Sequence, residues 1–401
     1  MSAYITGFGI ISGLGCGYEE TLEAIMQKRT AIGEISFLET ALKQYPVAEV
    51  KMNNNSLTRL AALPENKIYS RTFLLGIIAA LQAMQMAGLK STQGILGSTT
   101  VGGMDLTEQY YRQLMDTTDN FPLKKEIVSS LECADCTEQI AEYFGIHSNV
   151  TTMSTACTSS ANAIMLGARM IRNGLMDSIL VGGMDSLSRF SINGFNSLEI
   201  LSPTGCRPFD QQRNGVTIGE GAAFLVLESE KAAACKTVYG EIVGYANRSE
   251  AFHQTASSPD GIGAVLTIQD ALKVAGIQPS DIEYINAHGT GTYINDLSEG
   301  IAIGTVFGDN IPPVSSTKAY TGHTLAAASA IEAVLCLLSI KEQFVLPNLG
   351  FENAMEELSF IPQKEVKKSE INYVLSNSLG FGGANSALII KKIKTSFAPF
   401  A

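Results

Sequence analysis

The chain has 401 residues, of which 45% are hydrophobic and 17% charged, and its formal net charge is −11. This length and apolar content predict a sizeable core in two domains or one duplicated unit, and they argue against a disordered binder. The acidic balance, with no long run of Lys and Arg, argues against nucleic-acid binding.

The first half of the chain alternates strands and helices. An apolar run at 3–12 predicts an opening strand rather than a signal peptide, because no basic segment precedes it. Apolar residues at helical spacing and short continuous apolar runs predict the elements that follow. These are helices at 17–28, 67–88, 135–144 and 158–173 and strands at 150–153, 178–183 and 222–227, with a polar surface excursion at 99–128 and a loop at 205–221.

A second series of strands and helices begins near residue 238. The expected elements are strands at 240–247, 282–287, 312–316 and 385–391 and helices at 262–275, 296–306 and 324–341. This alternation predicts an α/β fold with mixed or parallel sheets. Since no low-complexity linker separates the two series, we expect two closely packed halves, 1–237 and 238–401.

The cysteines and the longest apolar stretch indicate the compartment of the protein and whether it crosses a membrane. Seven cysteines, odd in number and widely scattered, predict reduced thiols in a cytoplasmic protein. Cys133 and Cys136 form a lone CxxC with no second pair or nearby histidine, so we expect no metal site. The apolar stretch at 333–340 is too short to span a bilayer, and we therefore expect no membrane span.

Cys157 is the most informative single residue. Small residues follow it, and then an apolar helical pattern begins. The first turn of a helix has unpaired N–H groups and a positive dipole end, so a thiol there is expected to have a lowered pKa and to favour the nucleophilic thiolate. On this segment alone, a buried structural cysteine is an equally good interpretation.

Two of the four histidines lie at strand–helix junctions. His288 follows the predicted strand at 282–287, and His323 precedes the predicted helix at 324–341, both among Gly, Thr and Ser. Functional groups of α/β proteins gather at such junctions. One histidine of this kind is more often structural, but three such motifs in one chain indicate a site.

Four ordered motifs resemble those of the elongating β-ketoacyl-(acyl carrier protein) synthases, which are condensing enzymes with a thiolase-like fold. The motifs are those at 155–160, 287–292, 316–323 and 377–385, and the resemblance extends over 3–391. Thiolases would show a Cys–His–Cys set and initiating synthases a Cys–His–Asn set. The Cys–His–His set of this chain points to elongation.

The resemblance implies a fold and a reaction. The fold would be a duplicated thiolase-like arrangement of five layers, α-β-α-β-α, with the nucleophile in the first half and the two histidines in the second. The reaction would be a decarboxylative Claisen condensation of a malonyl-carrier with an acyl group on Cys157, which extends the chain by two carbons in fatty acid or specialised polyketide (polyene) biosynthesis. No cofactor is implied. The implied partners are an acyl carrier protein and a second subunit, in a homodimer or in a heterodimer with a related ketosynthase-like chain.

The resemblance also implies residue roles. Cys157 would take the acyl group, and the backbone N–H groups of Cys157 and Phe381 would form an oxyanion hole. His288 and His323 would donate to the enolate oxygen that forms when the malonyl group loses CO2.

Four further polar residues have a structural alternative. Lys318 and Glu332 would organise the site electrostatically near His323, or would form a buried structural ion pair. Thr290 and Thr292 would bind the pantetheine arm of the carrier, or would only satisfy local backbone groups.

A gate is implied over the acyl tunnel. Phe381 would move as the acyl chain enters, with Gly380, Gly382 and Gly383 as the hinge. Phe195 matches a second gating phenylalanine. The alternative for either ring is plain core packing.

Some residues depart from the family pattern. Ala326 and Ser329 stand where the family usually has glycines, and Asn214 stands where an aspartate is expected. The added groups are small, so we expect catalysis to survive.

Two hypotheses concern the substrate and the carrier. If Glu132 or Asp135 faces the acyl tunnel, a long saturated chain would be disfavoured, and a short, polyunsaturated or aryl-capped chain would be preferred. Lys67 and Arg71 are the nearest candidates for a basic surface that docks an acidic carrier. Two alternatives to condensation stay open: a relative that only decarboxylates or transfers acyl groups, and a partner subunit whose intact site is incidental.

Overall fold

The structure is a computed structural model that describes residues 2–116 and 125–393. Each half of the chain contributes five strands to the main path of an eleven-stranded sheet, and the short β2 (Gly15–Cys16) pairs with β1 off this path. Those of the first half are β1 (Tyr4–Ser12), β5 (Ile95–Ser98), β6 (Val150–Met153), β7 (Ser178–Asp185) and β8 (Gly221–Glu228). Those of the second half are β9 (Gly240–Ser249), β10 (Tyr284–Asn286), β11 (Val314–Ser315), β14 (Tyr373–Gly380) and β15 (Ala384–Lys391).

The two sets of strands have the same topology. The first half runs in the order β1-β8-β7-β5-β6, and the second half runs in the order β9-β15-β14-β10-β11. In both, the first two pairings are antiparallel and the last two are parallel. A short pairing between β1 and β9 joins the halves into one continuous sheet. The predicted duplicated α/β unit is therefore confirmed.

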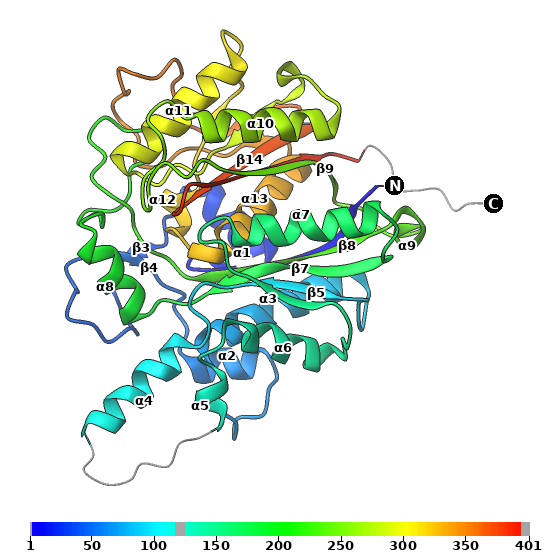
Figure 1. Ribbon diagram of the computed structural model, residues 1–401, viewed down its shortest axis with the longest axis vertical. Coiled ribbons are helices and arrows are strands. Elements are labelled where there is room, and N and C mark those ends of the chain that lie inside the picture. Colours follow the sequence, from blue (N-terminus) through cyan, green and yellow to red (C-terminus); the bar gives the residue numbers. More distant parts are fainter. Residues whose placement is uncertain (1, 117–124, 394–401) are drawn as a thin grey trace.

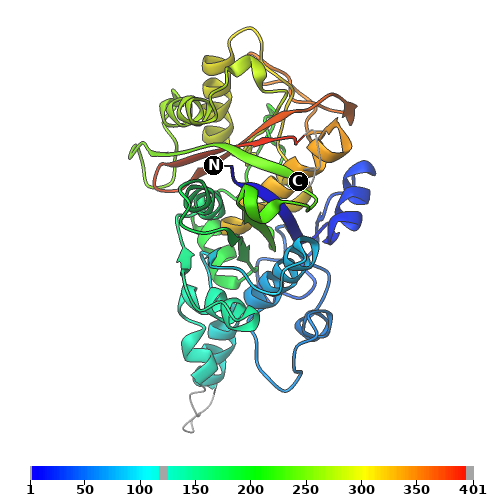
Figure 2. The ribbon, with the colours of Figure 1, turned by 90° about the vertical axis from the view of Figure 1, so that its right-hand side faces the viewer.

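Six helices complete the layers. They are α3 (Arg71–Ala87), α6 (Cys133–Phe144), α7 (Ser159–Arg172), α10 (Ile262–Ala275), α11 (Tyr293–Phe307) and α13 (Ala328–Glu342). α7 and α13 lie between the two halves of the sheet, whereas α3 and α6 cover one outer face and α10 and α11 the other (Figure 1). Figure 2 shows the same stacking from the side, with the C-terminal half above the N-terminal half. The five-layered α-β-α-β-α arrangement is confirmed.

The central layer explains the composition of α13. Every residue of this helix up to Ile340 is buried, because it packs on both halves of the sheet and on α7. A helix buried all round needs apolar residues on every face. The polar residues that it does carry, Ser329 and Glu332 among them, are therefore exceptions with specific partners.

The remaining elements are short or peripheral. They are α1 (Tyr18–Met26), α2 (Asn54–Leu60), α4 (Met104–Asp116), α5 (Lys125–Ser129), α8 (Arg189–Ser197), α9 (Glu230–Ala233), α12 (Lys318–Thr321), β2 (Gly15–Cys16), β3 (Ile32–Gly33), β4 (Val47–Ala48), β12 (Phe344–Val345), β13 (Lys367–Lys368) and the 3-10 turns η1 (Pro279–Asp281) and η2 (Leu325–Ala327). In residues 2–116 and 125–393, none of the helices has the length and hydropathy that a membrane crossing needs.

Three sequence predictions about elements were wrong in part. The expected surface excursion at 99–128 contains α4 and α5, with 117–124 outside the described residues. The expected turn at 377–385 contains the end of β14, which was not predicted, and the start of β15. The helix expected at 324–341 begins as η2 and becomes α-helical at Ala328, because Leu325 has a φ of 52°.

Candidate active site

A strained turn presents Cys157 between β6 and α7. Ala156, directly before it, has a φ of 54°, in the left-handed region that residues with a side chain rarely adopt. The Ser159 hydroxyl holds the turn, since it donates to the Ala156 carbonyl at 2.6 Å and accepts from the Thr155 N–H at 2.8 Å. α7 begins two residues after Cys157, whose side chain is buried.

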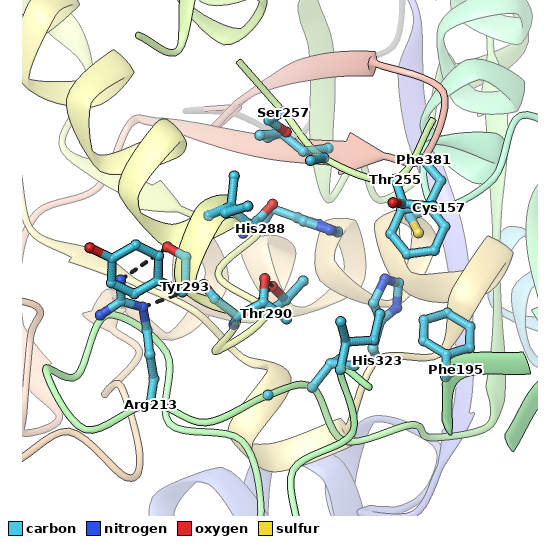
Figure 3. Close-up of a pocket in the computed structure, with 18 of the residues that line it drawn as sticks. Cys157, Phe195, Arg213, Thr255, Ser257, His288, Thr290, Tyr293, His323 and Phe381 are labelled. Atoms are coloured by element: carbon cyan, nitrogen blue, oxygen red, sulfur yellow. Dashed lines mark hydrogen bonds between the residues drawn. The ribbon is translucent and has the colours of Figure 1, made fainter. Parts of the chain in front are cut away.

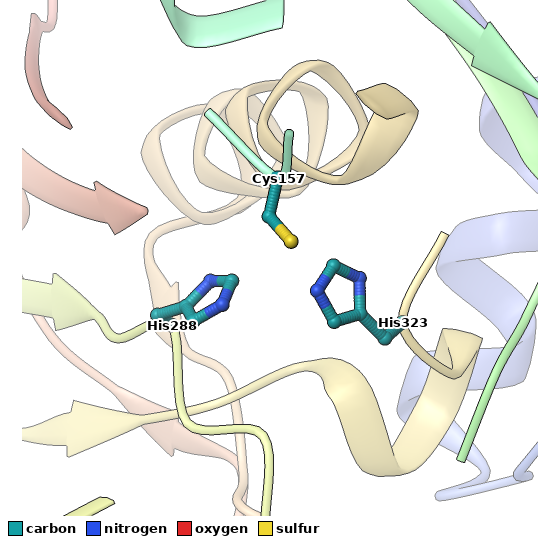
Figure 4. A group of neighbouring side chains, drawn as sticks. All are labelled: Cys157, His288 and His323. Carbon is teal, nitrogen blue, oxygen red and sulfur yellow. The ribbon is translucent and has the colours of Figure 1, made fainter. Parts of the chain in front are cut away.

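The turn brings Cys157 against both predicted histidines. The sulfur and one ring nitrogen of each histidine all lie within 4.8 Å of one another, and all three residues are buried. The rings of His288 and His323 are 5.3 Å apart between centroids and nearly perpendicular, at 86°. Figure 4 shows a nitrogen of each ring facing the space in front of the sulfur.

Hydrogen bonds fix the tautomer of both rings. The Leu325 N–H can only donate, and it donates to Nδ1 of His323 at 3.1 Å. The Lys318 ammonium likewise can only donate, and its Nζ lies 3.1 Å from Nδ1 of His288. Each neutral ring must therefore carry its proton on Nε2, so the site offers two N–H donors in front of the sulfur.

Both histidines stay neutral because of their surroundings. Burial, and then the positive charge of Lys318, hold the pKa of His288 and of His323 well below the usual value of 6.5. A neutral Nε2–H can donate a hydrogen bond to a developing oxyanion without first gaining a proton.

The expectation of a lowered thiol pKa was wrong. Burial raises the pKa of Cys157 to about 11, although Lys318 and the hydrogen bond from the Phe381 backbone lower it. Desolvation of the thiolate raises the pKa by more than the N-terminus of the helix lowers it, because α7 begins only at Ser159. Cys157 therefore rests as a thiol.

Lys318 links two buried groups. Its Nζ lies 2.5 Å from Oε1 of Glu332, and both side chains are almost fully buried, at 1% and 2% exposure. Burial raises the pKa of Glu332, while Lys318 lowers it. Although Lys318 was expected near His323, its hydrogen bond goes to His288. Lys318 thus belongs to the site as well as to an ion pair.

Two carboxylates that the sequence analysis did not single out support the histidine loops. Glu299 on α11 accepts from the backbone N–H groups of His288 and Gly289, at 2.7 and 2.8 Å. Asp185 at the end of β7 accepts from the Ala326 N–H at 2.8 Å, next to the residue that bonds His323. Their sequence spacing gives no signal for these roles, because both act on backbone groups.

The end of β14 passes alongside Cys157. A Cβ at Gly380 would lie 3.3 Å from the Cys157 backbone nitrogen, so only a glycine fits there without displacement. Phe381 follows, and Gly382 and Gly383 turn the chain with φ values of 82° and 76°. The backbone N–H of Phe381 is therefore held close to Cys157, to which it gives a hydrogen bond.

A cavity of about 360 Å³ opens onto the three residues. Thr290 and Thr292 line it, with their hydroxyl oxygens 2.9 Å apart. Phe195 and Phe381 also line it, and their rings stack at 5.7 Å between centroids (Figure 3). All the side chains predicted for the gate and for the pantetheine arm thus face one cavity.

The wall of the cavity includes residues that the sequence analysis did not assign. Arg213 stacks on the ring of Tyr293, 4.7 Å from its centroid, and donates to the Tyr293 carbonyl at 3.0 Å. Thr255 and Ser257 line the cavity from the loop after β9. No motif marks Thr255 or Ser257, whereas Arg213 lies in the loop that the sequence predicted at 205–221.

Cys157, His288 and His323 are also a set of metal-ligand types, but their protons disfavour a metal. Coordination through Nε2 would move each proton to Nδ1, where it would face the Leu325 N–H or the Lys318 ammonium. The donors that fix the tautomers thus oppose a bound cation.

One sequence hypothesis, a carrier-docking role for Arg71, fails on geometry, whereas the substrate hypothesis on Glu132 and Asp135 stays a prediction. Among the described residues that line the cavity at Cys157, neither Glu132 nor Asp135 is present. Asp135 instead lines a separate pocket and accepts from Gln139 at 2.6 Å. Arg71 is buried against Glu220, with its guanidinium 2.6 Å from the carboxylate, and so presents no charge to a carrier. Lys67 is exposed.

Comparison with known proteins shows the family of the chain. Residues 3–233 match the family model "Beta-ketoacyl synthase, N-terminal domain", and residues 239–352 match "Beta-ketoacyl synthase, C-terminal domain". The chain belongs to the β-ketoacyl synthase family. The first matched segment of this β-ketoacyl synthase contains Cys157, and the second contains His288, Lys318, His323 and Glu332.

Individual relatives of this β-ketoacyl synthase cover nearly its whole length. The 3-oxoacyl-[acyl-carrier-protein] synthase 2 of Staphylococcus aureus (strain COL) is 33% identical, over 97% of this chain and 98% of its own. The ishigamide ketosynthase/chain length factor structure has a TM-score of 0.91 and 30% identity, over 98% and 99%. The ketosynthase ApeO in complex with its chain length factor ApeC, from Xenorhabdus doucetiae, has a TM-score of 0.86 and 32% identity, over 98% of both chains.

Proposed function

We propose that this protein is a condensing 3-oxoacyl-(acyl carrier protein) synthase, an acyltransferase that extends an acyl chain by two carbons at the expense of malonyl-carrier. The observation that carries the proposal is one buried thiol faced by two neutral Nε2–H donors. A thiol can hold an acyl group, and two donors can hold an enolate.

The first step is acyl transfer to Cys157. The sulfur attacks the thioester carbonyl of an acyl-carrier, and the backbone N–H groups of Cys157 and Phe381 stabilise the tetrahedral oxyanion. The bond from the carbonyl carbon to the carrier sulfur then breaks. The proton of the Cys157 thiol is transferred to the departing pantetheine sulfur, so the step consumes no other base.

The second step makes the carbon nucleophile. Malonyl-carrier loses CO2, and the electron pair of the broken C–C bond becomes an enolate with its charge on the thioester oxygen. His288 and His323 donate to that oxygen through Nε2–H. Lys318 and Glu332 act behind His288, where the Lys318 ammonium keeps Nδ1 without a proton.

The third step joins the two carbon chains. The enolate carbon attacks the carbonyl of acyl-Cys157, and the same backbone N–H groups hold the new oxyanion. The bond to sulfur breaks, the 3-oxoacyl product stays on the carrier, and the Cys157 thiolate takes up a proton from solvent. Balanced over the cycle, one CO2 leaves for each two-carbon extension.

Access to the site involves the rings and hydroxyls at the cavity. The stacked pair of Phe195 and Phe381 supports a gate, and Gly380 and Gly382 beside Phe381 support a hinge there. Thr290 and Thr292 are proposed to bind the pantetheine arm, which can place donor and acceptor groups against their hydroxyls.

The partners are proposed to be an acyl carrier protein and a second ketosynthase-like subunit. β6 ends the sheet, and among the described strands it pairs only with β5. A strand edge left unpaired is a template for another chain. Solved relatives are described with a chain length factor or with an acyl carrier protein, which supports both partners. The pathway is fatty acid or specialised polyketide synthesis.

Two further proposals concern organisation and location. We place the division between the halves at 1–237 and 238–401, which the repeated strand order supports. We also propose a cytoplasmic protein, and all seven cysteines are free, as expected of a reducing compartment.

Intact-mass spectrometry tests the covalent step. The purified protein is mixed with a panel of acyl-carrier thioesters, and the matched control is Cys157→Ala. We expect the protein to gain the mass of the preferred acyl group and the control to gain nothing. No mass gain with any acyl group would contradict the proposal for the chain alone and would favour a subunit that acts only with its partner.

A further inference from the structure

A chain of two hydroxyls ends on the nucleophile. Ser329 on α13 donates to the Cys157 carbonyl oxygen at 3.1 Å, and its Oγ lies 2.8 Å from Oγ of Ser378 on β14. Both serines are almost fully buried. A carbonyl can only accept, so the Ser329 proton is committed to Cys157 and Ser378 must donate to Ser329. The direction of the chain is therefore fixed, from Ser378 through Ser329 to Cys157.

The Cys157 carbonyl depends on this donor. The first α7 carbonyl to accept a main-chain bond is that of Thr158, from the Asn162 N–H at 3.0 Å. Within the part of the chain that the structure describes, Ser329 is the hydrogen-bond donor to the Cys157 carbonyl. Without the hydroxyl, a buried carbonyl would lose its partner next to the strained φ of Ala156.

The two serines also connect the elements that form the oxyanion hole. Ser378 and Gly380 lie on β14, Phe381 directly follows the end of this strand, and Gly380 passes close to the Cys157 nitrogen. The hydroxyl chain therefore ties the turn that carries one N–H donor to the strand whose end leads into the other. Neither serine has a described hydrogen bond to His288 or His323.

We propose that Ser329 and Ser378 are positioning residues that hold the Cys157 and Phe381 N–H groups at the separation an oxyanion needs. This inference rests on the proposed function and deepens it. It separates two parts of the site, because tetrahedral intermediates depend on the N–H pair, whereas the enolate depends on the histidines. Loss of the hydroxyl chain should slow acyl transfer and leave malonyl decarboxylation intact.

The test compares these two reactions in Ser329→Ala. Acylation of Cys157 by acyl-carrier is followed by quenched-flow mass spectrometry, and CO2 release from malonyl-carrier is measured in a Cys157→Ala background, with and without Ser329→Ala. We expect acylation to be roughly tenfold slower with an unchanged KM, since small misplacements of donors are costly, and CO2 release to change less than about twofold. Ser378→Ala should act similarly, and the double variant should be no slower than the slower single variant.

Ser339→Ala is the matched control. Ser339 lies on the same helix, is fully buried and donates to the Phe344 carbonyl at 2.8 Å, far along α13 from the site. We expect a similar loss of stability and no change in either rate. If Ser329→Ala does not fold, Ser378→Ala carries the test, because it leaves the bond to Cys157 in place.

Two results would overturn the inference: wild-type acylation rates in Ser329→Ala and Ser378→Ala, or a parallel loss of acylation and CO2 release, which would indicate a general structural role. A wild-type protein that is never acylated would instead overturn the proposed function, and this inference with it.

Discussion

At the scale of single residues, the site depends on which nitrogen of each histidine carries the proton. Backbone and lysine donors occupy both Nδ1 atoms, so His288 and His323 cannot take a proton at Nδ1 without losing a hydrogen bond. In the proposed reaction, both therefore act as donors rather than as bases towards Cys157. This agrees with a thiol that keeps its proton until an acyl-carrier arrives.

Decarboxylation should be insensitive to pH near the usual histidine pKa. Because burial and Lys318 hold the pKa of both rings well below 6.5, neither ring gains a proton as the pH falls through that value. Burial raises the pKa of Glu299, which supports the His288 loop, to about 7, so the measurement uses Cys157→Ala/Glu299→Gln. We expect CO2 release by this variant to stay within about twofold between about pH 7.5 and about pH 5.5. An inflection with an apparent pKa near 6.5 would contradict neutral, Nε2-protonated rings.

Lys318 should serve both stability and chemistry, and two variants separate the roles. Lys318→Met leaves Glu332 buried without its partner, so we expect a loss of about 3–5 kcal/mol in unfolding free energy. The double variant Lys318→Met/Glu332→Leu removes both charges and should recover most of that stability. Denaturant unfolding measures both.

CO2 release in both Lys318 variants should be roughly tenfold or more slower than in the protein that keeps Lys318. The reason is that Nδ1 of His288 no longer has a fixed donor. Recovery of CO2 release together with stability in the double variant would show that Lys318 is only a structural ion-pair partner.

At the scale of elements, close packing of β1 on α3 sets the outer layer. Gly7 and Gly9 face the helix so closely that a Cβ at Gly9 would lie 2.1 Å from the Ala79 carbonyl oxygen. The contacting helix residues, Ala79 and Ala83, are also small and fully buried. Strand and helix thus meet at backbone atoms, with the Cβ atoms of Gln82 and Ala87 the nearest side-chain atoms.

Gly9→Ala should therefore lower the unfolding free energy by at least about 2 kcal/mol, because backbone must shift to admit the methyl group. Gly33→Ala on β3 is the control, since a Cβ there has no atom within 4 Å. We expect Gly33→Ala to change stability by less than about 0.5 kcal/mol. Equal stabilities of the two variants in urea unfolding would contradict the close approach.

Elements with a strong periodic pattern could be predicted from the sequence, and elements defined by distant partners could not. The helix at 262–275 has the bounds expected of it, and the expected strand at 3–12 was confirmed as β1. β14 was missed because Ser376, Asn377 and Ser378 are polar and interrupt the apolar pattern of a buried strand, yet all three are buried in the middle of the sheet.

The site shows the same limit. Cys157, His288 and His323 could be predicted as site residues, because their motifs lie at strand–helix junctions and resemble those of a known family. Arg71 was misplaced because a charged residue at a helix start resembles a surface residue, and its partner Glu220 lies 149 positions away. The rise in the Cys157 pKa could not be predicted either, since local sequence shows the helix start but not the burial.

At the scale of the whole molecule, duplication places the nucleophile and the histidines on opposite halves of one site. Cys157 follows β6 in the first half, whereas His288 follows β10 in the second, and these strands occupy the last and the next-to-last places of the matching strand orders. The central helices α7 and α13 each follow a site residue by a few positions. Packing of the halves is therefore a condition of activity.

The free edge of β6 predicts self-association. We expect native mass spectrometry of the purified chain to give a species of twice 42.8 kDa, because the unpaired edge can pair with a second copy. A monomer at micromolar concentration would contradict this and would favour a heterodimer with a related subunit. Adding that subunit should then produce the dimer.

A single-turnover experiment on isolated acyl-Cys157 protein tests most directly whether one site performs both capture and condensation. The acylated protein is mixed with malonyl-carrier labelled in its carboxylate, and released CO2 and 3-oxoacyl-carrier are counted together. We predict one CO2 for each 3-oxoacyl product, with Cys157 returned to the free thiol. Release of CO2 while the acyl group stays on Cys157 would contradict condensation and identify a decarboxylase.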